Sequence, residues 1–268
     1  MVKKFILFIT AFVFSFSSFN IRADDDFNHK PKKWWGENSH KNKNKKSRHS
    51  ENSDDESLNP EGMADLIDSP TTNVIDYGGF RLNFRFYSKG GILNHISFGV
   101  FRRLNLGASW DVEKFIGTED PATNVPTLNI KIRVFDGGIF LPSFAIGYDG
   151  QGRFFNRDTD QYNERERGIY GVFGRELFLP NLETYGGANI AKFKEGTVFG
   201  FLGISFNVEQ KVALMLEYDN IRQMPSNHLN AGFRVFPLPS LGIDFAVRNI
   251  TTPSDRERIV RINYVGSF

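Results

Sequence analysis

The sequence predicts an all-β protein: an antiparallel transmembrane β-barrel of about twelve strands that follows a disordered N-terminal tail. Three observations support this prediction. Apolar and polar residues alternate in many short segments after Gly79, the last of these segments ends on a C-terminal Phe268, and aromatic residues make up 15% of the chain. A period of two is the pattern of a β-strand with one apolar and one polar face. In a membrane barrel, the apolar face contacts lipid and the polar face lines the lumen.

The first residues have the pattern of a secretory signal peptide. Lys3 and Lys4 precede an apolar segment from Phe5 to Phe16. This segment is shorter than the ~20 residues that a membrane helix needs. Ile21-Arg22-Ala23 fits a cleavage site. We therefore expect residues 1–23 to be a cleaved signal peptide rather than an uncleaved anchor, and the mature protein to be exported.

Residues 24–64 are predicted to form a disordered periplasmic tail. The stretch is rich in Lys, Asn, Ser, His and Asp and has few aliphatic residues, so it cannot bury enough apolar surface to fold. Its basic part is a candidate for contact with anionic lipid or polysaccharide. Its three histidines are candidates for loose metal binding. These histidines are His29, His40 and His49. We favour a plain spacer, because charge runs are usually solvated.

The composition excludes several classes of function. The absence of cysteine excludes disulfides, a lipid-anchored cysteine, thiolate metal sites and a cysteine nucleophile. A net charge of only +2 argues against a nucleic-acid binder. The sequence contains no P-loop, dinucleotide-binding, zinc-binding or kinase motif. We therefore expect no cofactor, no metal ion and no enzymatic activity.

Twelve segments carry the strand pattern. In chain order they are residues 80–86, 95–100, 104–113, 128–134, 143–149, 168–176, 183–192, 198–206, 212–218, 229–235, 241–247 and 260–268. The sixth and seventh are rich in glycine and alternate least clearly, so ten strands is the main alternative. In hydrocarbon each unpaired backbone amide costs several kcal/mol, so the first strand should pair with the last.

The connections support this count. If the N-terminus is periplasmic, odd-numbered connections lie outside the cell and even-numbered ones lie inside. The odd-numbered set includes the long connections at residues 118–124, 150–167, 220–228 and 249–257. The even-numbered set includes the tight turns at residues 102–103, 208–210 and 237–240. Bacterial barrels have short periplasmic turns and longer external loops, so the residues from 65 to 268 are predicted to be one outer-membrane barrel.

The polar faces of these strands carry charged residues that are candidates for lining the lumen. The basic ones are Arg81, Arg85, Lys131, Arg133, Arg175, Arg234, Arg248 and Arg261, and the acidic ones are Asp111, Glu113, Asp149, Glu217, Asp219 and Asp244. They fit a narrow pore for anionic or sugar-acid solutes. They equally fit an interior sealed by salt bridges, because an unpaired buried charge is costly. A soluble lipocalin-like barrel or β-sandwich would instead place these charges outside.

His95 and Ser97 lie on one face of the second strand. Outer-membrane phospholipase A, also a twelve-stranded barrel, presents a similar His-x-Ser pair toward lipid. Here Ile96 and Phe98 occupy the lipid face, so His95 and Ser97 should point into the lumen. We therefore expect a non-catalytic pair, since no third group is assigned.

The connection from Gly150 to Arg167 carries four carboxylates, which can bind calcium. They are Asp158, Asp160, Glu164 and Glu166. Their spacing matches no EF-hand, and neighbouring arginines offset their charge. We expect a solvated outer loop.

The last segment resembles the closing strand of bacterial outer-membrane β-barrels. Tyr264 and Phe268 share its apolar face, although Gly266 stands where a bulky residue is usual. In that family the barrel-assembly machinery reads a terminal aromatic strand. The resemblance implies an assembly signal at Tyr264 and Phe268, the outer membrane of a Gram-negative-type bacterium as the location, and outer-membrane lipid and the assembly machinery as partners.

Four segments resemble the YjbH-type outer-membrane proteins, which are associated with exopolysaccharide production. They are Asp68–Thr72, Leu104–Gly107, Pro142–Asp149 and Ala213–Asp219. The resemblance implies a narrow channel or an accessory component for surface-polysaccharide export, with polysaccharide or envelope proteins as partners. It implies no catalytic residues. The alternatives are a non-conducting structural or interaction barrel and a lipid-hydrolysing barrel enzyme.

Overall fold

The computed structural model describes residues 64–138, 141–159, 161–165, 167–177, 179–191, 196–221 and 228–268. The predicted signal peptide and residues 24–63 of the predicted tail lie outside this part of the chain. Within the described ranges, no helix is long and apolar enough to cross a membrane.

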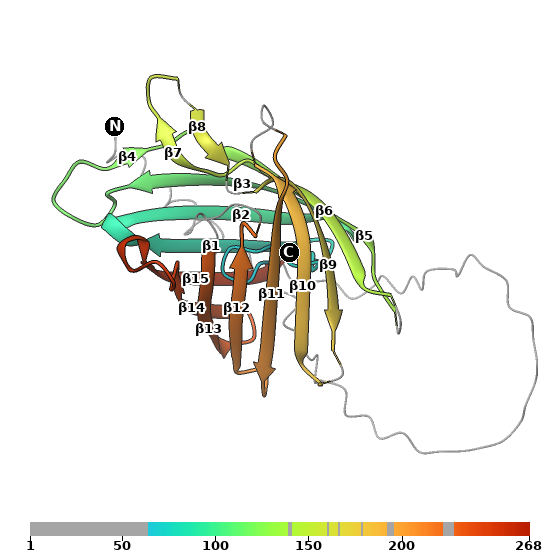
Figure 1. Cartoon of the computed structure of the whole chain (residues 1–268). Helices are drawn as coiled ribbons and strands as arrows, with labels where there is room; N and C mark the ends of the chain where they lie inside the picture. The colour runs from blue at the N-terminus through green and yellow to red at the C-terminus, as the bar shows by residue number, and fades with distance from the viewer. Residues whose placement is uncertain are drawn as a thin grey trace, which may run out of the picture. The chain divides into compact units, whose positions relative to one another are not determined.

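Twelve antiparallel strands close into a barrel (Figure 1). They are β1 (Gly79–Tyr87), β2 (Gly91–Phe101), β3 (Leu104–Glu113), β5 (Thr127–Phe135), β6 (Ser143–Asp149), β9 (Gly168–Glu176), β10 (Leu182–Ile190), β11 (Phe199–Val208), β12 (Val212–Asp219), β13 (His228–Leu238), β14 (Leu241–Arg248) and β15 (Glu257–Ser267). Each pairs with its neighbours in this order, and β15 pairs back with β1. The predicted fold class and strand count are confirmed.

The sixth and seventh barrel strands, β9 and β10, are full strands despite their glycines. A Cβ at Gly187 would lie 2.5 Å from the Phe201 ring and 2.2 Å from the Gly171 carbonyl oxygen. A Cβ at Gly174 would lie 2.9 Å from the Tyr185 ring. Neighbouring aromatic rings therefore cover these glycines, and this is why the residues at these positions do not alternate visibly in the sequence.

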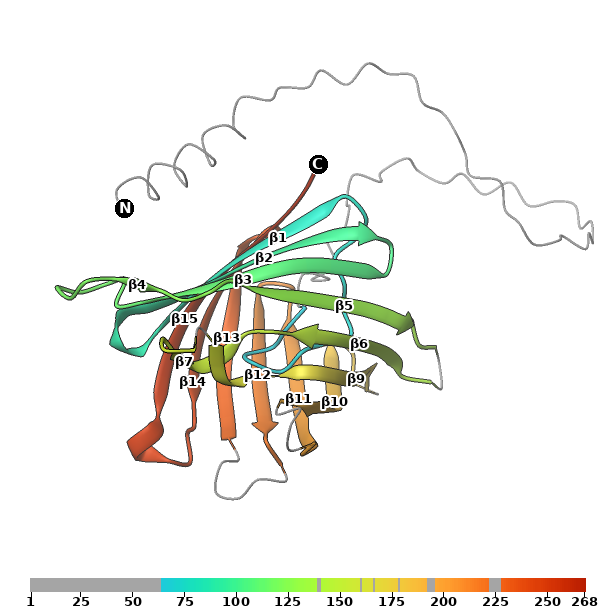
Figure 2. The same cartoon turned by 90° about the horizontal axis from the view of Figure 1, so that it is seen from above.

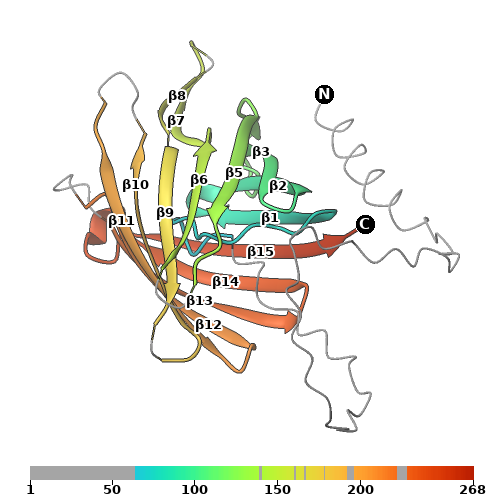
Figure 3. The same cartoon turned by 90° about the vertical axis from the view of Figure 1, so that its right-hand side faces the viewer.

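The connections at the two ends of the barrel differ in length. One end carries tight turns such as Arg102–Arg103 and Glu209–Lys211. The opposite end carries the short strand β4 (Ala122–Thr123), the turns η2 (Ser88–Gly90) and η3 (Pro253–Asp255), and a two-stranded sheet. That sheet pairs β7 (Gly152–Asn156) with β8 (Gln161–Arg165) and extends beyond the end of β6 (Figure 3).

The outer surface of the barrel is apolar. Alternate strand positions expose large hydrophobic side chains around the sheet, among them Leu106, Ile130, Ile146, Phe173, Leu202, Ile204, Leu214, Leu216, Phe233, Phe245 and Val260. The intervening positions carry the buried polar and charged residues. A soluble barrel has the opposite arrangement, and a monomeric soluble protein rarely exposes so continuous an apolar surface. A lipid-facing barrel presents this pattern.

The C-terminal residue lies on this outer face. Phe268 is 77% exposed, and its ring centroid is 5.1 Å from that of Phe80 and 6.4 Å from that of Phe98. A Cβ at Gly266 would lie 2.7 Å from the Phe80 ring. Gly266 therefore interrupts the apolar series because the Phe80 side chain of β1 occupies that space.

Candidate functional site

Residues 64–71 form a hairpin inside the barrel, which we call the lumen hairpin. The segment before β1 lies within the ring of strands (Figure 2). Asp65 and Pro70 form an antiparallel bridge, and the Thr71 amide donates to the Ala64 carbonyl oxygen at 3.0 Å. Leu66 is fully buried. The hairpin therefore occupies the lumen rather than preceding the barrel as a linker.

A single wall carboxylate holds the tip of the lumen hairpin. Glu217 of β12 accepts hydrogen bonds from the backbone amides of Ile67 at 2.7 Å, of Asp68 at 3.0 Å and of Ser69 at 2.8 Å. Glu217 is only 1% exposed. Successive amides that converge on one anion form a nest, and hydrogen bonds to a charged group are the stronger kind. The nest offsets the cost of burying this carboxylate.

Some lumen arginines are neutralised by the barrel wall itself. Asp244 of β14 accepts from Arg234 at 2.5 Å and from Arg261 at 2.6 Å. Arg167, which directly precedes β9, binds Asp219 of β12 through two hydrogen bonds of 2.7 and 2.8 Å. These groups are almost entirely buried. Paired geometry of this kind is what makes buried charges tolerable.

Other lumen arginines take their counter-charge from the lumen hairpin. Arg81 of β1 lies 3.0 Å from Asp65. Asp68 lies 3.1 Å from Arg85 of β1 and 2.6 Å from Arg248 of β14. Arg248 also lies 3.0 Å from Glu257. The hairpin therefore adds two carboxylates to a part of the wall in which Glu257 also contacts Arg248.

The carbonyl oxygens of the lumen hairpin and of the residue after it accept further hydrogen bonds from basic wall residues. The donor–acceptor pairs are Lys131 to Ala64 (2.8 Å), Arg234 to Asp65 (3.3 Å), Arg261 to Leu66, Arg85 and Arg261 to Ile67 (both 2.9 Å), Arg167 to Asp68 (3.2 Å) and Arg133 to Thr72 (2.9 Å). The wall is thus a cationic lining around an extended chain of acceptors.

The lumen hairpin also has an apolar anchor. Leu66 and Ile67 belong to a buried cluster with Phe201 and Met215. Leu66 fits above Gly203 of β11, where a Cβ would lie 2.4 Å from the leucine Cδ1. The absence of a side chain at residue 203 therefore creates the space for the leucine.

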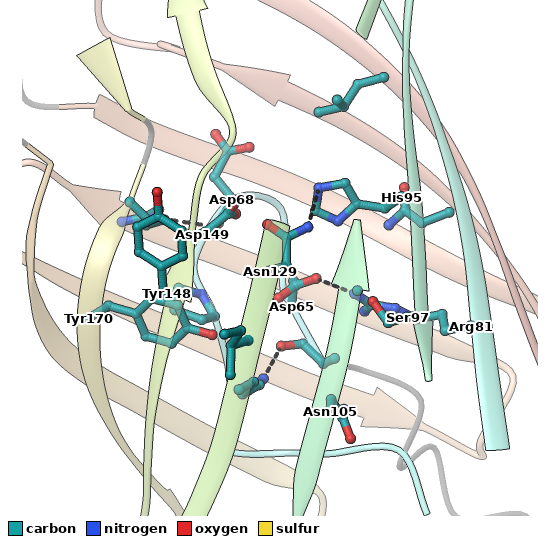
Figure 4. Close-up of a pocket in the computed structure, with 18 of the residues that line it drawn as sticks. Asp65, Asp68, Arg81, His95, Ser97, Asn105, Asn129, Tyr148, Asp149 and Tyr170 are labelled. Atoms are coloured by element: carbon teal, nitrogen blue, oxygen red, sulfur yellow. Dashed lines mark hydrogen bonds and ion pairs between the residues drawn. The ribbon is translucent and has the colours of Figure 1, made fainter. Parts of the chain in front are cut away.

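On the opposite side of the hairpin lies a small polar cavity of about 70 Å³ (Figure 4). Its lining includes His95 and Ser97 of β2, Asn105 of β3 and Asn129 of β5. Both predicted lumen residues, His95 and Ser97, face this space. The His95 Nε2 atom lies 3.4 Å from the side-chain amide group of Asn129. Within the described ranges, no group of three or more His, Cys, Asp or Glu residues could hold a metal ion.

Three of the predicted lumen carboxylates lie near the end of the barrel that carries the long connections. Asp111 accepts from the Tyr87 hydroxyl at 2.6 Å and from Asn124 at 2.9 Å. Glu113 accepts from the same Asn124 amide at 3.1 Å. Asp149 accepts from the backbone amide of Gln151 at 2.9 Å. They fasten connecting loops and make none of the hairpin contacts given above.

The position of Arg175 differs from the predicted one. It is exposed at the end of β9 and has the parity of the outward-facing Ile169 and Phe173, whereas Tyr170 and Val172 face inward. The expectation that Arg175 lines the lumen is therefore wrong. The glycines of this strand concealed which positions alternate inward.

The acidic outer connection is only partly within the described ranges. Asp160 and Glu166 lie outside them, and the side chain of Glu164 is not described. Asp158 is exposed, and its backbone amide donates to the Asn156 side chain at 2.9 Å. The described residues of this connection therefore provide no set of calcium ligands.

Three residues that organise the lumen were not among the predicted lumen positions. Asp65 and Asp68 precede the first strand, and Arg167 was assigned to an outer loop. One sequence signal near them is the Asp68–Thr72 segment that resembles YjbH-type proteins. A second is the apolar pair Leu66 and Ile67 between Asp65 and Asp68, which is unusual in a solvated linker.

No protein-family model and no curated protein matches the sequence. Among solved structures, the chain is similar to a KdgM porin, with a TM-score of 0.44 and 12% identity over 71% of this chain and 99% of that one. A KdgM porin in complex with disordered oligogalacturonate gives 0.41 and 10% over 71% and 99%. Salmonella typhi OmpF in complex with daunomycin gives 0.30 and 7% over 70% and 96%. The chemistry of the lumen therefore decides the function proposed for the chain.

Proposed function

We propose that the protein is an outer-membrane β-barrel that acts as a narrow channel for anionic solutes, as an accessory of surface-polysaccharide export. The observation that carries this proposal is the cationic lining of the lumen. Asp65 and Asp68 of the hairpin bring negative charge to Arg81, Arg85 and Arg248, and Arg248 also contacts Glu257 of the wall. A permanently sealed barrel would be expected to balance these charges within its own wall, as Asp244 does for Arg234 and Arg261.

The location and the partners are part of the proposal. The apolar outer face supports insertion into lipid. A cleaved signal peptide over residues 1–23 would carry the chain across the inner membrane, and the exposed Phe268 beside Phe80 would serve as the assembly signal together with Tyr264. The resemblance of four segments to YjbH-type proteins supports polysaccharide or envelope proteins as partners.

A non-conducting structural barrel is the second candidate, because the lumen hairpin fills the interior. The enzymatic alternative has less support. A cavity of about 70 Å³ beside His95 and Ser97 is far smaller than the ~300–1,000 Å³ of ordinary ligand pockets. A lipid chain does not fit into it.

Single-channel recording on the refolded full chain tests the proposal. Because the hairpin fills the lumen, the wild-type protein should conduct little. A variant that lacks residues 64–71 should conduct steadily and favour anions over cations. A shift of its electrophoretic mobility on heating would verify that this variant is a folded barrel. If the folded deletion variant conducts no current, the protein is not a channel.

A further inference from the structure

Asp68, at the tip of the lumen hairpin, occupies a site built by three barrel strands. Its carboxylate lies 3.1 Å from Arg85 of β1, 2.6 Å from Arg248 of β14 and 3.4 Å from the Asn230 amide nitrogen of β13. The side chains of Asp68, Arg85 and Arg248 are 5%, 12% and 9% exposed. A carboxylate held by two guanidinium groups and an amide is a specific anion contact rather than a surface ion pair.

The neighbouring wall carboxylates are already engaged. Asp219 binds Arg167, Asp244 binds Arg234 and Arg261, and Glu217 accepts the hairpin amides. Glu257 contacts Arg248 from the other side, at 3.0 Å. If Asp68 left the site, the guanidinium groups of Arg85 and Arg248 would lose the carboxylate that lies between them. Arg248 would keep its contact with Glu257, but the buried site would hold one negative charge fewer, and this favours the entry of another anion.

The hairpin is built as a separable part. Among the described residues, its one β-bridge joins Asp65 to Pro70 within the hairpin, whereas the barrel strands pair with one another. The polar cavity lined by His95, Ser97 and Asn105 borders the hairpin on one side, so the hairpin is packed less tightly there. Its contacts with the basic wall residues are made by carboxylate, carbonyl and hydroxyl oxygens, and carboxylate and hydroxyl oxygens are the acceptors of an acidic oligosaccharide.

From these observations we propose that the lumen hairpin is a displaceable plug, in which Asp68 is the tethered occupant of an anion-binding site formed by Arg85 and Arg248. The ligand that competes with it is a chain that carries carboxylates, such as an acidic oligosaccharide. The proposal rests on the channel function above, and it adds the binding site and the means by which the channel closes.

The first test is the Asp68→Asn variant of the full chain in planar bilayers. It removes the charge and keeps the shape, so the plug should leave the closed position more often and the open probability should rise about tenfold or more, the range expected when a buried ion pair loses one partner. Asp68→Glu, which keeps the carboxylate, should stay closed. Asp120→Asn is the matched control, because Asp120 is exposed in a connecting loop.

A disulfide lock shows whether the hairpin itself is the plug. The chain contains no cysteine, so Leu66→Cys with Gly203→Cys introduces one unambiguous pair. The Cδ1 and Cγ atoms of Leu66 lie 2.4 and 3.8 Å from a Cβ built at residue 203, so the two side chains would point toward one another, as a disulfide requires. In the Asp68→Asn background, oxidation should abolish the current and a reductant should restore it.

A third experiment tests whether the ligand is an anion. Sodium glucuronate should block the current of Asp68→Asn at concentrations at which glucose has no effect. Equal effects of glucuronate and glucose would overturn the anion site.

If Asp68→Asn behaves like Asp120→Asn while the hairpin deletion conducts, the plug role of Asp68 is wrong but the channel remains. If the folded deletion variant does not conduct, the channel function itself fails.

Discussion

The two sides of the lumen hold the hairpin in different ways. On the side of β11 to β15, Glu217 receives its amides, Asp244 fixes two arginines, and Leu66 packs over Gly203. On the side of β2, β3 and β5, the hairpin faces a polar cavity lined by His95 and Ser97. A displaceable plug needs a surface to which it binds firmly and a side on which it is packed less tightly. The difference therefore assigns most of the stability to the side of β11 to β15 and the looser packing to the side of β2, β3 and β5.

The largest effect is expected at Asp244, on the packed side. The change Asp244→Ala leaves Arg234 and Arg261 buried without their shared carboxylate. Loss of one partner from a buried ion pair typically costs about 3–5 kcal/mol, so the urea midpoint of the refolded barrel, followed by tryptophan fluorescence, should fall accordingly.

Asp136→Ala is the control for this change. Asp136 pairs with Arg103 where both side chains are about half exposed, and such pairs contribute roughly 0–1 kcal/mol. If the two variants unfold at the same urea concentration, the packed side does not carry the stability assigned to it.

An intermediate effect is expected from Glu217→Gln. The three hairpin amides would lose a charged acceptor, and a hydrogen bond to a charged group contributes about 1.5–3 kcal/mol. Because the hairpin is outside the strand ladder, the loss should appear locally. Amide hydrogen exchange in the peptide that contains Ile67–Ser69 should accelerate by roughly tenfold or more, since 1.4 kcal/mol is a factor of ten.

Exchange in the barrel strands should change little in Glu217→Gln. Glu209→Gln serves as the control, because Glu209 lies in a tight turn with its side chain 77% exposed. Acceleration that spreads equally through β11 to β15 would show that the hairpin and the wall unfold together, and the plug would then not be separable.

The sequence predicts the barrel well and the plug poorly, for a physical reason. A strand reveals itself locally, since Ile130 and Ile132 alternate with Asn129 and Lys131 wherever the sheet separates lipid from lumen. The hairpin has no such period. Its tip is ordered by Glu217, which lies 150 residues from Ile67 in the chain.

The ion pairs of individual charged residues were also not predictable from the local sequence. Alternation predicts that Arg85 and Arg248 face inward, but not that both meet Asp68. Arg175 was misassigned because glycines obscure the alternation of β9. Local pattern therefore determines the face on which a side chain lies, whereas its partner depends on the closed barrel.

The smallest effect comes from one substitution made on each side of the lumen. Ser97 of β2 borders the cavity, whereas Ser205 of β11 is completely buried. A change from serine to valine adds volume at both positions and suits a strand.

At Ser205 the packed surroundings must shift, at a cost of about 1–3 kcal/mol in the free energy of unfolding. At Ser97 the cavity accepts the added methyl group, so the change should stay within about 0.5 kcal/mol. Urea unfolding of both variants measures the difference, and equal losses would mean that the cavity side is as tightly packed as the other.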